Sequence, residues 1–226
     1  MDNRSDNRSD NQSDARRDNR ERQRLFDEWA RHYDHSVQSG QGYPFDGYDR
    51  VLDRILALAA PQPGMDVLEL GVGTGNLATR FIEAGVTLWG LDFSNEMLAA
   101  ARTKLPQARL AQADLLGEWP EAFQRRYHRV VSAYVFHEFD FAAKAALLGR
   151  LARHHLVDGG YVVIGDIAFP TREALARVRE LAGRSWDEDE EYWVAAEAIP
   201  ALESLGFSVA YEQLSSCGGV FVIRPG

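Results

Sequence analysis

The sequence predicts an α/β fold with a doubly wound, mostly parallel sheet of seven strands. Apolar runs typical of buried strands alternate with helical patterns from Met65 to about Ala168. This alternation favours a parallel sheet covered by helices on both faces. The last two strand-like runs, at 206–214 and 218–225, are joined by a short turn. Strands this close pair antiparallel, because a parallel crossover needs about a dozen residues or more. The last strand is therefore expected to be antiparallel.

The expected elements follow one another in a regular order. Helices are predicted near 24–37 and at 46–59, and apolar residues recur with helical spacing in the second of them. Strands are then predicted at 65–70, 86–92, 108–114, 127–136 and 159–168. Between them we expect helices at 76–84 and 141–155, and a third that Ser94 caps and that extends to Lys104. A short helical segment is expected at 120–125. Two further helices are predicted at 172–182 and at about 190–204, before the last two strands.

The chain divides into a polar tail and a single domain. Residues 1–24 repeat a four-residue polar unit and contain seven arginines against six acids. This composition predicts a disordered tail whose charges nearly cancel. Residues 25–226 are enough for one well-filled domain. Within this domain, residues 25–60 are expected to form an N-terminal helical cover.

Composition and charge exclude several classes of function. The formal net charge of −9 argues against nucleic acid as the main partner. No window approaches the length of apolar sequence that spans a membrane, and the N-terminus has no apolar core of a secretory signal. Cys217 is the only cysteine, so no internal disulfide can form. A cytoplasmic location is the expectation for such a chain.

A glycine-rich turn, "ELGVGTGNL", follows the first predicted strand and opens a helix. Such a turn indicates a ligand that approaches the backbone closely. The dinucleotide fingerprint would place its third glycine at position 76, where this chain has Asn76. The lysine-containing phosphate loop is also absent. A nicotinamide-dependent oxidoreductase therefore fits the turn less well than a ligand without phosphate.

The spacing E-x-G-x-G-x-G, from Glu69 to Gly75, resembles motif I of the class I S-adenosylmethionine-dependent methyltransferases. The segments "FDEWARHYD", "VLELGVGTGNL", "YVFHEF" and "IPALESLGFSV" are similar to those of small bacterial methyltransferases of the YrrT type. The resemblance covers roughly residues 25–224. It implies a Rossmann-like methyltransferase fold, S-adenosylmethionine as cofactor and S-adenosylhomocysteine as product.

The resemblance also implies which residues bind the cofactor. Asp92 would accept hydrogen bonds from the ribose hydroxyls, Asp114 would hold the adenine amino group and Phe93 would pack on adenine. Glu69 would serve the positively charged end of the cofactor through water or backbone amides. The complete predicted set is Glu69, Gly71, Gly73, Gly75, Asp92, Phe93, Asp114, Leu115, Tyr134 and, from a "YD" position in the N-terminal cover, Tyr33.

His137, just past the fourth strand in "YVFHEF", is the candidate catalytic residue. An imidazole accepts a proton near neutral pH, so His137 would serve as the base for an amine or hydroxyl acceptor. Its alternatives are to orient the cofactor carboxylate or to cap the next helix. Glu138, Asp140 and Asp166 lie near it in the predicted fold, and together they could hold a divalent cation. Such carboxylates also serve as helix caps, and no tight ligand motif exists, so no metal is expected.

The two helical covers supply aromatic residues around the acceptor. In the family, the substrate cover comes from the N-terminal helices and from the segment after the fifth strand, here 170–204. The predicted substrate residues are Trp29, Tyr43, Trp186, Tyr192 and Trp193. Simple packing in the core is the alternative for the tryptophans. The acidic run 187–191 is expected in the first turn of a helix, where acids suit the helix dipole. Attraction of a cationic acceptor is the alternative for this run.

The predicted function is methyl transfer to a small-molecule acceptor through a sulfur, nitrogen or oxygen atom. "SAYVFHE" lacks the tetrapeptide [DN]-P-P-[YF] by which enzymes that methylate DNA bases or glutamine hold a planar nitrogen. The alternative is a cofactor-binding sensor or scaffold without catalysis, because a fold does not fix a function. Either protein would act as a monomer or a homodimer.

Overall fold

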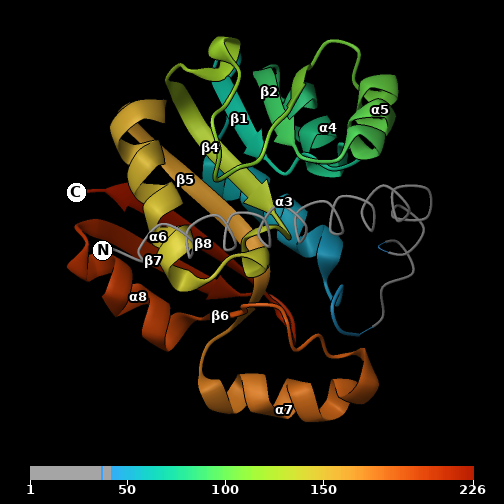
Figure 1. Cartoon of the computed structure of the whole chain (residues 1–226), viewed down its shortest axis with the longest axis vertical. Helices are drawn as coiled ribbons and strands as arrows, with labels where there is room; N and C mark the ends of the chain where they lie inside the picture. The colour runs from blue at the N-terminus through green and yellow to red at the C-terminus, as the bar shows by residue number, and fades with distance from the viewer. Residues whose placement is uncertain (1–36, 38–41) are drawn as a thin grey trace, which may run out of the picture.

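The computed structural model describes residue 37 and residues 42–226, and Figure 1 shows their arrangement. The sheet has a seven-strand path in the order β3-β2-β1-β4-β5-β8-β7, and a short strand, β6, pairs with β5 beside it. The strands are β1 (Asp66–Leu70), β2 (Thr87–Asp92), β3 (Arg109–Gln112), β4 (Tyr127–Ala133), β5 (Leu156–Phe169), β6 (Trp193–Val194), β7 (Phe207–Gln213) and β8 (Gly218–Pro225). All pairs are parallel except those of β8 with β5 and β7. The predicted fold class is confirmed.

Helices cover both faces of the sheet (Figure 1). One face packs against α3 (Tyr48–Ala59), α4 (Asn76–Glu83) and α5 (Asn95–Lys104), and the other against α6 (Phe141–Arg150) and α8 (Ala195–Ser204). The apolar stripe of α3 explains its position, because Val51, Leu52 and Ile55 are fully buried against the sheet. The seventh helix, α7 (Arg172–Ala182), buries none of its residues and stands beyond the end of β5.

The topology gathers the sequence motifs at one edge. β1 lies between β2 and β4 in the centre of the sheet, and all three run parallel. The carboxyl ends of parallel strands meet at the same edge, where the connections that bind ligands lie. The glycine turn after β1, Asp92 at the end of β2 and the segment after β4 are therefore neighbours in space.

The predicted helix at 190–204 is shorter than expected. It begins at Ala195, after the two-residue strand β6, and the acidic run 187–191 lies before it in irregular backbone. The expectation that these acids occupy the first turn of a helix is therefore wrong. Tertiary hydrogen bonds explain the difference. Glu191 N donates to the His137 carbonyl over 2.7 Å, and Trp193 pairs with Ala168 of β5.

Two smaller differences concern element ends. β4 stops at Ala133 rather than at 136, and Tyr134 follows with φ +56°, a left-handed conformation that breaks the strand. Within the helix expected at 141–155, the α-helix ends at Arg150, and the chain continues as a π-helix over Leu151–His155. The tail, the helix near 24–37 except for Val37, and the predicted site residues Trp29 and Tyr33 lie outside the described residues. Among the described residues, none of the helices combines the length and the apolar character that crossing a membrane demands.

Candidate active site

The glycine turn joins β1 to α4, and its three glycines serve different purposes. Gly71, Gly73 and Gly75 have φ values of +69°, +51° and +88°, in the region that favours glycine. A Cβ on Gly71 would lie 2.2 Å from Val135 Cγ2, and one on Gly75 would lie 2.7 Å from Leu105 Cδ1. A Cβ on Gly73 would meet no atom of the described part of the chain within 4 Å. Gly71 and Gly75 thus permit close packing, whereas Gly73 faces open space.

Glu69 places a carboxylate in the interior beside this turn. Its side chain is 2% exposed, and among the described residues its Oε2 has no hydrogen-bond partner. Burial, followed by the nearby charge of Asp92, raises the pKa of Glu69 well above its ordinary value. Oε2 is an acceptor without a donor, which is costly in a folded protein. Glu69 lines a hollow of about 20 Å³ together with Gly73 and other residues that include Tyr48, Thr74, Asn76 and Ala133.

Asp92 ends β2 and ties the glycine turn to the next helix. Its Oδ2 accepts a hydrogen bond from Gly73 N over 2.8 Å, and its Oδ1 accepts one from Ser94 N over 2.9 Å. Ser94 in turn caps α5, because its Oγ accepts from Met97 N at 3.1 Å. This is the cap that the sequence predicts. The carboxylate is 5% exposed, so the backbone amides hold it in one orientation.

The predicted adenine-binding residues lie further along the same edge. Asp114 Oδ1 accepts a hydrogen bond from Leu116 N over 2.9 Å, which closes a local turn. Leu115 is 6% exposed and belongs to the core on the α6 side of the sheet. The Phe93 carbonyl accepts from Gln112 Nε2 over 2.9 Å, which joins the ends of β2 and β3. These contacts place the three residues near the sheet edge, and their roles in binding stay predictions.

Tyr134 follows β4 in its strained left-handed conformation. Its ring stacks on Tyr48, with centroids 5.1 Å apart, and meets Phe45 edge-on at 5.9 Å. The hydroxyl is buried and has no hydrogen-bond partner among the described residues. Burial is the main cause that raises its pKa well above the ordinary value. A second buried polar atom without a partner thus lies near the hollow, on the side of α3.

His137 and Asp166 form a buried pair at the ends of β4 and β5. His137 Nδ1 lies 2.6 Å from Asp166 Oδ1, and the two side chains are 7% and 0% exposed. Asp166 Oδ2 accepts a hydrogen bond from Trp193 Nε1 over 3.0 Å. These contacts fix the imidazole ring and direct Nε2 away from Asp166. Asp166 receives its hydrogen bonds from β6 and η2 (Phe136–Glu138), so three segments meet at one carboxylate.

Two further carboxylates face the other nitrogen of the ring. Nε2 lies 3.8 Å from Glu138 Oε1 and 3.7 Å from Glu190 Oε1. Burial disfavours the charged imidazole, but Asp166 first, then Glu190 and Glu138, outweigh it and raise the pKa of His137 to about 9. The segment that carries Glu190 is held in place, because Lys144 Nζ donates to the Glu191 carbonyl. Of the acids near His137, Asp140 instead caps α6 by accepting from Ala143 N at 2.7 Å.

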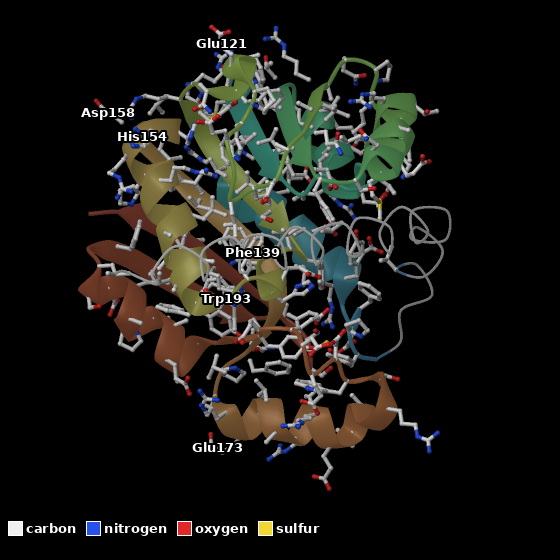
Figure 2. All side chains as sticks on the ribbon, viewed as in Figure 1. Glu121, Phe139, His154, Asp158, Glu173 and Trp193 are labelled. Carbon is white, nitrogen blue, oxygen red and sulfur yellow. The ribbon has the colours of Figure 1, made fainter. Side chains whose placement is uncertain are left out.

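The predicted substrate residues divide into two groups. Tyr43, Trp186 and Tyr192 pack on one another, with ring centroids 5.1 Å apart for the first pair and 4.5 Å for Trp186 and Tyr192. They form a cluster with Phe169 at the end of β5. Trp193 is 1% exposed and contacts the core instead. Figure 2 labels it near Phe139, and the ring of Phe136 lies 6.1 Å from both.

Sequence reasoning missed two residues of this site. Glu190 lies in the acidic run that was expected to start a helix, and only the tertiary hydrogen bonds bring it to His137. Tyr48 fits the apolar stripe of α3, and nothing in that pattern shows that its ring also lines the hollow beside Glu69. Asp166 was predicted in part, because its position at the end of the fifth strand placed it near His137 at the same edge of the sheet.

Comparison with known proteins identifies the class. Residues 67–160 match the family model described as a methyltransferase domain. A protein of Geobacillus thermodenitrificans described as an uncharacterized methyltransferase is 33% identical over 203 residues, which are 84% of this chain and 90% of that protein. One of Anoxybacillus flavithermus is 32% identical over 204 residues, 84% of this chain and 92% of that protein.

Solved structures agree on the fold. The structure of the DhpI–SAH complex has a TM-score of 0.67 and 23% identity, covering 90% of this chain and 95% of that one. Magnesium protoporphyrin IX methyltransferase from Synechocystis, with bound SAH, has a TM-score of 0.63 and 19% identity, covering 80% and 84%. At these identities the likeness concerns the fold alone.

A glycine turn after β1, an acid at the end of β2 and a sheet with one antiparallel strand define a Rossmann-like methyltransferase fold. The chain belongs to the class I S-adenosylmethionine-dependent methyltransferases, together with the bacterial relatives above. It is therefore an enzyme that transfers a methyl group from S-adenosylmethionine.

Proposed function

We propose that this enzyme methylates a small-molecule acceptor, with Glu69, Gly73 and Asp92 holding the cofactor and His137 taking the proton of the acceptor. The observation that carries the proposal is the His137–Asp166 pair, 2.6 Å apart and buried at the edge that also bears the glycine turn. A carboxylate on Nδ1, which leaves Nε2 on the opposite side of the ring to accept a proton, is the arrangement of a general base.

The residues beside the hollow fit the cofactor chemically. When bound, S-adenosylmethionine supplies an electrophilic methyl group on a positively charged sulfur. Glu69 offers a buried oxygen that has no donor among the described residues, and a cationic ammonium group nearby would satisfy it. Gly73 leaves open space where any other residue would place a side chain. The remaining predicted residues, Gly71, Gly75, Phe93, Asp114, Leu115 and Tyr134, would shape or border the same site.

Asp92 fits the ribose hydroxyls because an ionised carboxylate is a hydrogen-bond acceptor with about four lone-pair sites. The amides of Gly73 and Ser94 donate to its two oxygens and hold it at the end of β2. The hollow of about 20 Å³ has room for roughly one water molecule. A cofactor of this size would therefore extend beyond the hollow along the sheet edge.

In the proposed reaction, the acceptor atom forms a bond to the methyl carbon while the electron pair of the carbon–sulfur bond stays on sulfur. The acceptor gives its proton to His137 Nε2, and Asp166 stabilises the resulting imidazolium. Because the pKa of His137 is about 9, most of the imidazole already carries a proton at pH 7. Turnover of an amine or hydroxyl acceptor should therefore rise with pH up to about 9.

The test begins with an acceptor screen that uses isotope-labelled cofactor and detects products by mass spectrometry. On the acceptor so found, His137→Gln should lower turnover by about 10²- to 10⁴-fold and abolish the rise with pH, while cofactor affinity changes little. His154→Gln is the matched control, because His154 is exposed at the far end of the domain (Figure 2). Lost affinity with a surviving pH profile would instead assign His137 to orientation of the cofactor.

The class of acceptor follows from charge and size. The net charge of −9 disfavours nucleic acid, so we propose a small molecule that reacts through sulfur, nitrogen or oxygen. A thiol would need no base and would leave turnover of the His137 variant intact. The proposal includes a cytoplasmic setting, supported by the single cysteine, and a monomeric or homodimeric enzyme.

A further inference from the structure

The group formed by His137, Glu138 and Glu190 has the composition of a metal site. Each residue offers one ligand atom, and these atoms all lie within 4.8 Å of one another. An imidazole nitrogen and two carboxylate oxygens are ligands that divalent transition ions accept. From this geometry we infer that the cluster binds one divalent transition-metal ion, of the Mn²⁺ or Zn²⁺ kind.

The histidine nitrogen and the two carboxylate oxygens stand close to the spacing of ligands around one ion. Nε2 of His137 lies 3.8 Å and 3.7 Å from the two glutamate oxygens, beyond hydrogen-bond length. Two ligands about 2.1 Å from one ion, at angles of about 90–110°, stand roughly 3.0–3.4 Å apart. A shift of a few tenths of an ångström would bring each nitrogen–oxygen pair to that spacing.

The surroundings of His137 are those of a metal-binding histidine. Such a histidine donates its other ring N–H to a carboxylate, which fixes the tautomer and aims the ligating nitrogen. Asp166 is the carboxylate that accepts this hydrogen bond here, at 2.6 Å from His137 Nδ1, and Trp193 Nε1 donates to its other oxygen. The imidazole is 7% exposed, whereas the side chains of Glu138 and Glu190 are 18% and 20% exposed. An ion can therefore reach the cluster from solvent and lose most of its water there.

The charge balance also favours a dication. Asp166, Glu138 and Glu190 bring three carboxylates to one imidazole. Such a concentration of negative charge attracts a doubly charged cation. The inference does not depend on the proposed base role of His137. Both roles use Nε2 of His137, so this atom cannot bind the ion and accept a proton from the methyl acceptor at the same time.

Calorimetric titration of MnCl₂ and ZnCl₂ into the untagged full chain, without cofactor or acceptor, tests the site. We expect one ion per chain with a micromolar or lower Kd, and weaker binding of Mg²⁺, which prefers oxygen ligands. Glu190→Gln should weaken binding at least about tenfold. Glu190 lies in irregular surface backbone, so this variant should fold. Asp189→Asn, an exposed neighbour in the same acidic run, should bind like the wild type.

Pulsed electron paramagnetic resonance of the Mn²⁺ complex adds a readout specific to the histidine. The wild type should show coupling to an imidazole nitrogen, and His137→Gln should not. The inference is overturned if neither ion binds at about 1 mM, or if Asp189→Asn weakens binding as much as Glu190→Gln, which would indicate diffuse attraction by the acidic run. Because no methyl donor or acceptor is present, these results leave the proposed methyl transfer to be judged separately.

Discussion

Glu69 shows how a single residue can serve binding at the expense of stability. Its carboxyl is buried beside Asp92, and its Oε2 has no partner among the described residues. In the folded protein the raised pKa keeps the proton at pH values where the unfolded chain has already lost it. The free energy of unfolding therefore falls as the pH rises above the ordinary value of 4.5. A positively charged ligand beside Glu69 would reverse this penalty.

Glu69→Gln should therefore separate stability from binding. Without cofactor, we expect the variant to be more stable than the wild type at pH 7–8 by about 1–2 kcal/mol, and the difference should vanish as the pH falls towards 4.5. Cofactor affinity should fall by about tenfold or more, since a hydrogen bond to a charged group is worth roughly 1.5–3 kcal/mol. Urea unfolding at several pH values and calorimetry measure the two effects. Glu83→Gln, on the exposed face of α4, is the control. A less stable Glu69→Gln at pH 8 would contradict this account of the carboxyl.

The turn between β1 and α4 provides a comparison of two glycines within one element. Gly73→Ala places a methyl group in open space, so only the left-handed conformation should cost stability, by about 1–2 kcal/mol. Gly71→Ala adds a clash with Val135, and we expect a loss of about 2–5 kcal/mol. Both values come from urea unfolding. Despite its milder cost, Gly73→Ala should lose cofactor binding in calorimetry. Wild-type affinity in this variant would place the cofactor elsewhere.

Among the helices and strands, the sequence predicts best those features that depend on residues close together in the chain. The stripe of α3, the Ser94 cap of α5 and the short link between β7 and β8 all depend on neighbours in the chain, and all three are confirmed. The predicted start of α8 is wrong because residues before it make tertiary contacts instead of helical ones. Glu191 N donates to the His137 carbonyl, and Trp193 pairs with β5.

The candidate site was predictable only in part for the same reason. Glu69, Asp92 and the glycines belong to one motif with fixed spacing, so a sequence pattern can place them together. His137 and Asp166 are 29 residues apart, and their contact follows from the pairing of β4 with β5. Glu190 lies in a segment that the sequence pattern predicts to be helical, and its irregular backbone brings it to His137 instead. Hydrophobic periodicity carries no information on such side-chain contacts.

For the whole molecule, the composition of residues 1–24 leads to a prediction about truncation. This segment lies outside the described residues, and its sequence contains almost no apolar side chain that could add to a core. A chain that starts at residue 25 should melt at the same temperature as the full chain and bind the cofactor with the same affinity. Differential scanning calorimetry and ligand titration measure both. A large fall in melting temperature would show that the segment contributes to the folded domain.

The central claim is that the edge between β1, β2 and β4 binds S-adenosylmethionine. Its most direct test is calorimetric titration of the full chain with S-adenosylmethionine and S-adenosylhomocysteine, with NAD⁺ as the comparison ligand. For both S-adenosylmethionine and S-adenosylhomocysteine we predict one site per chain with a micromolar Kd, a binding free energy of about −8 kcal/mol. NAD⁺ should give no heat. Absence of heat and of any thermal shift at millimolar S-adenosylhomocysteine, or tighter binding of NAD⁺, would contradict it.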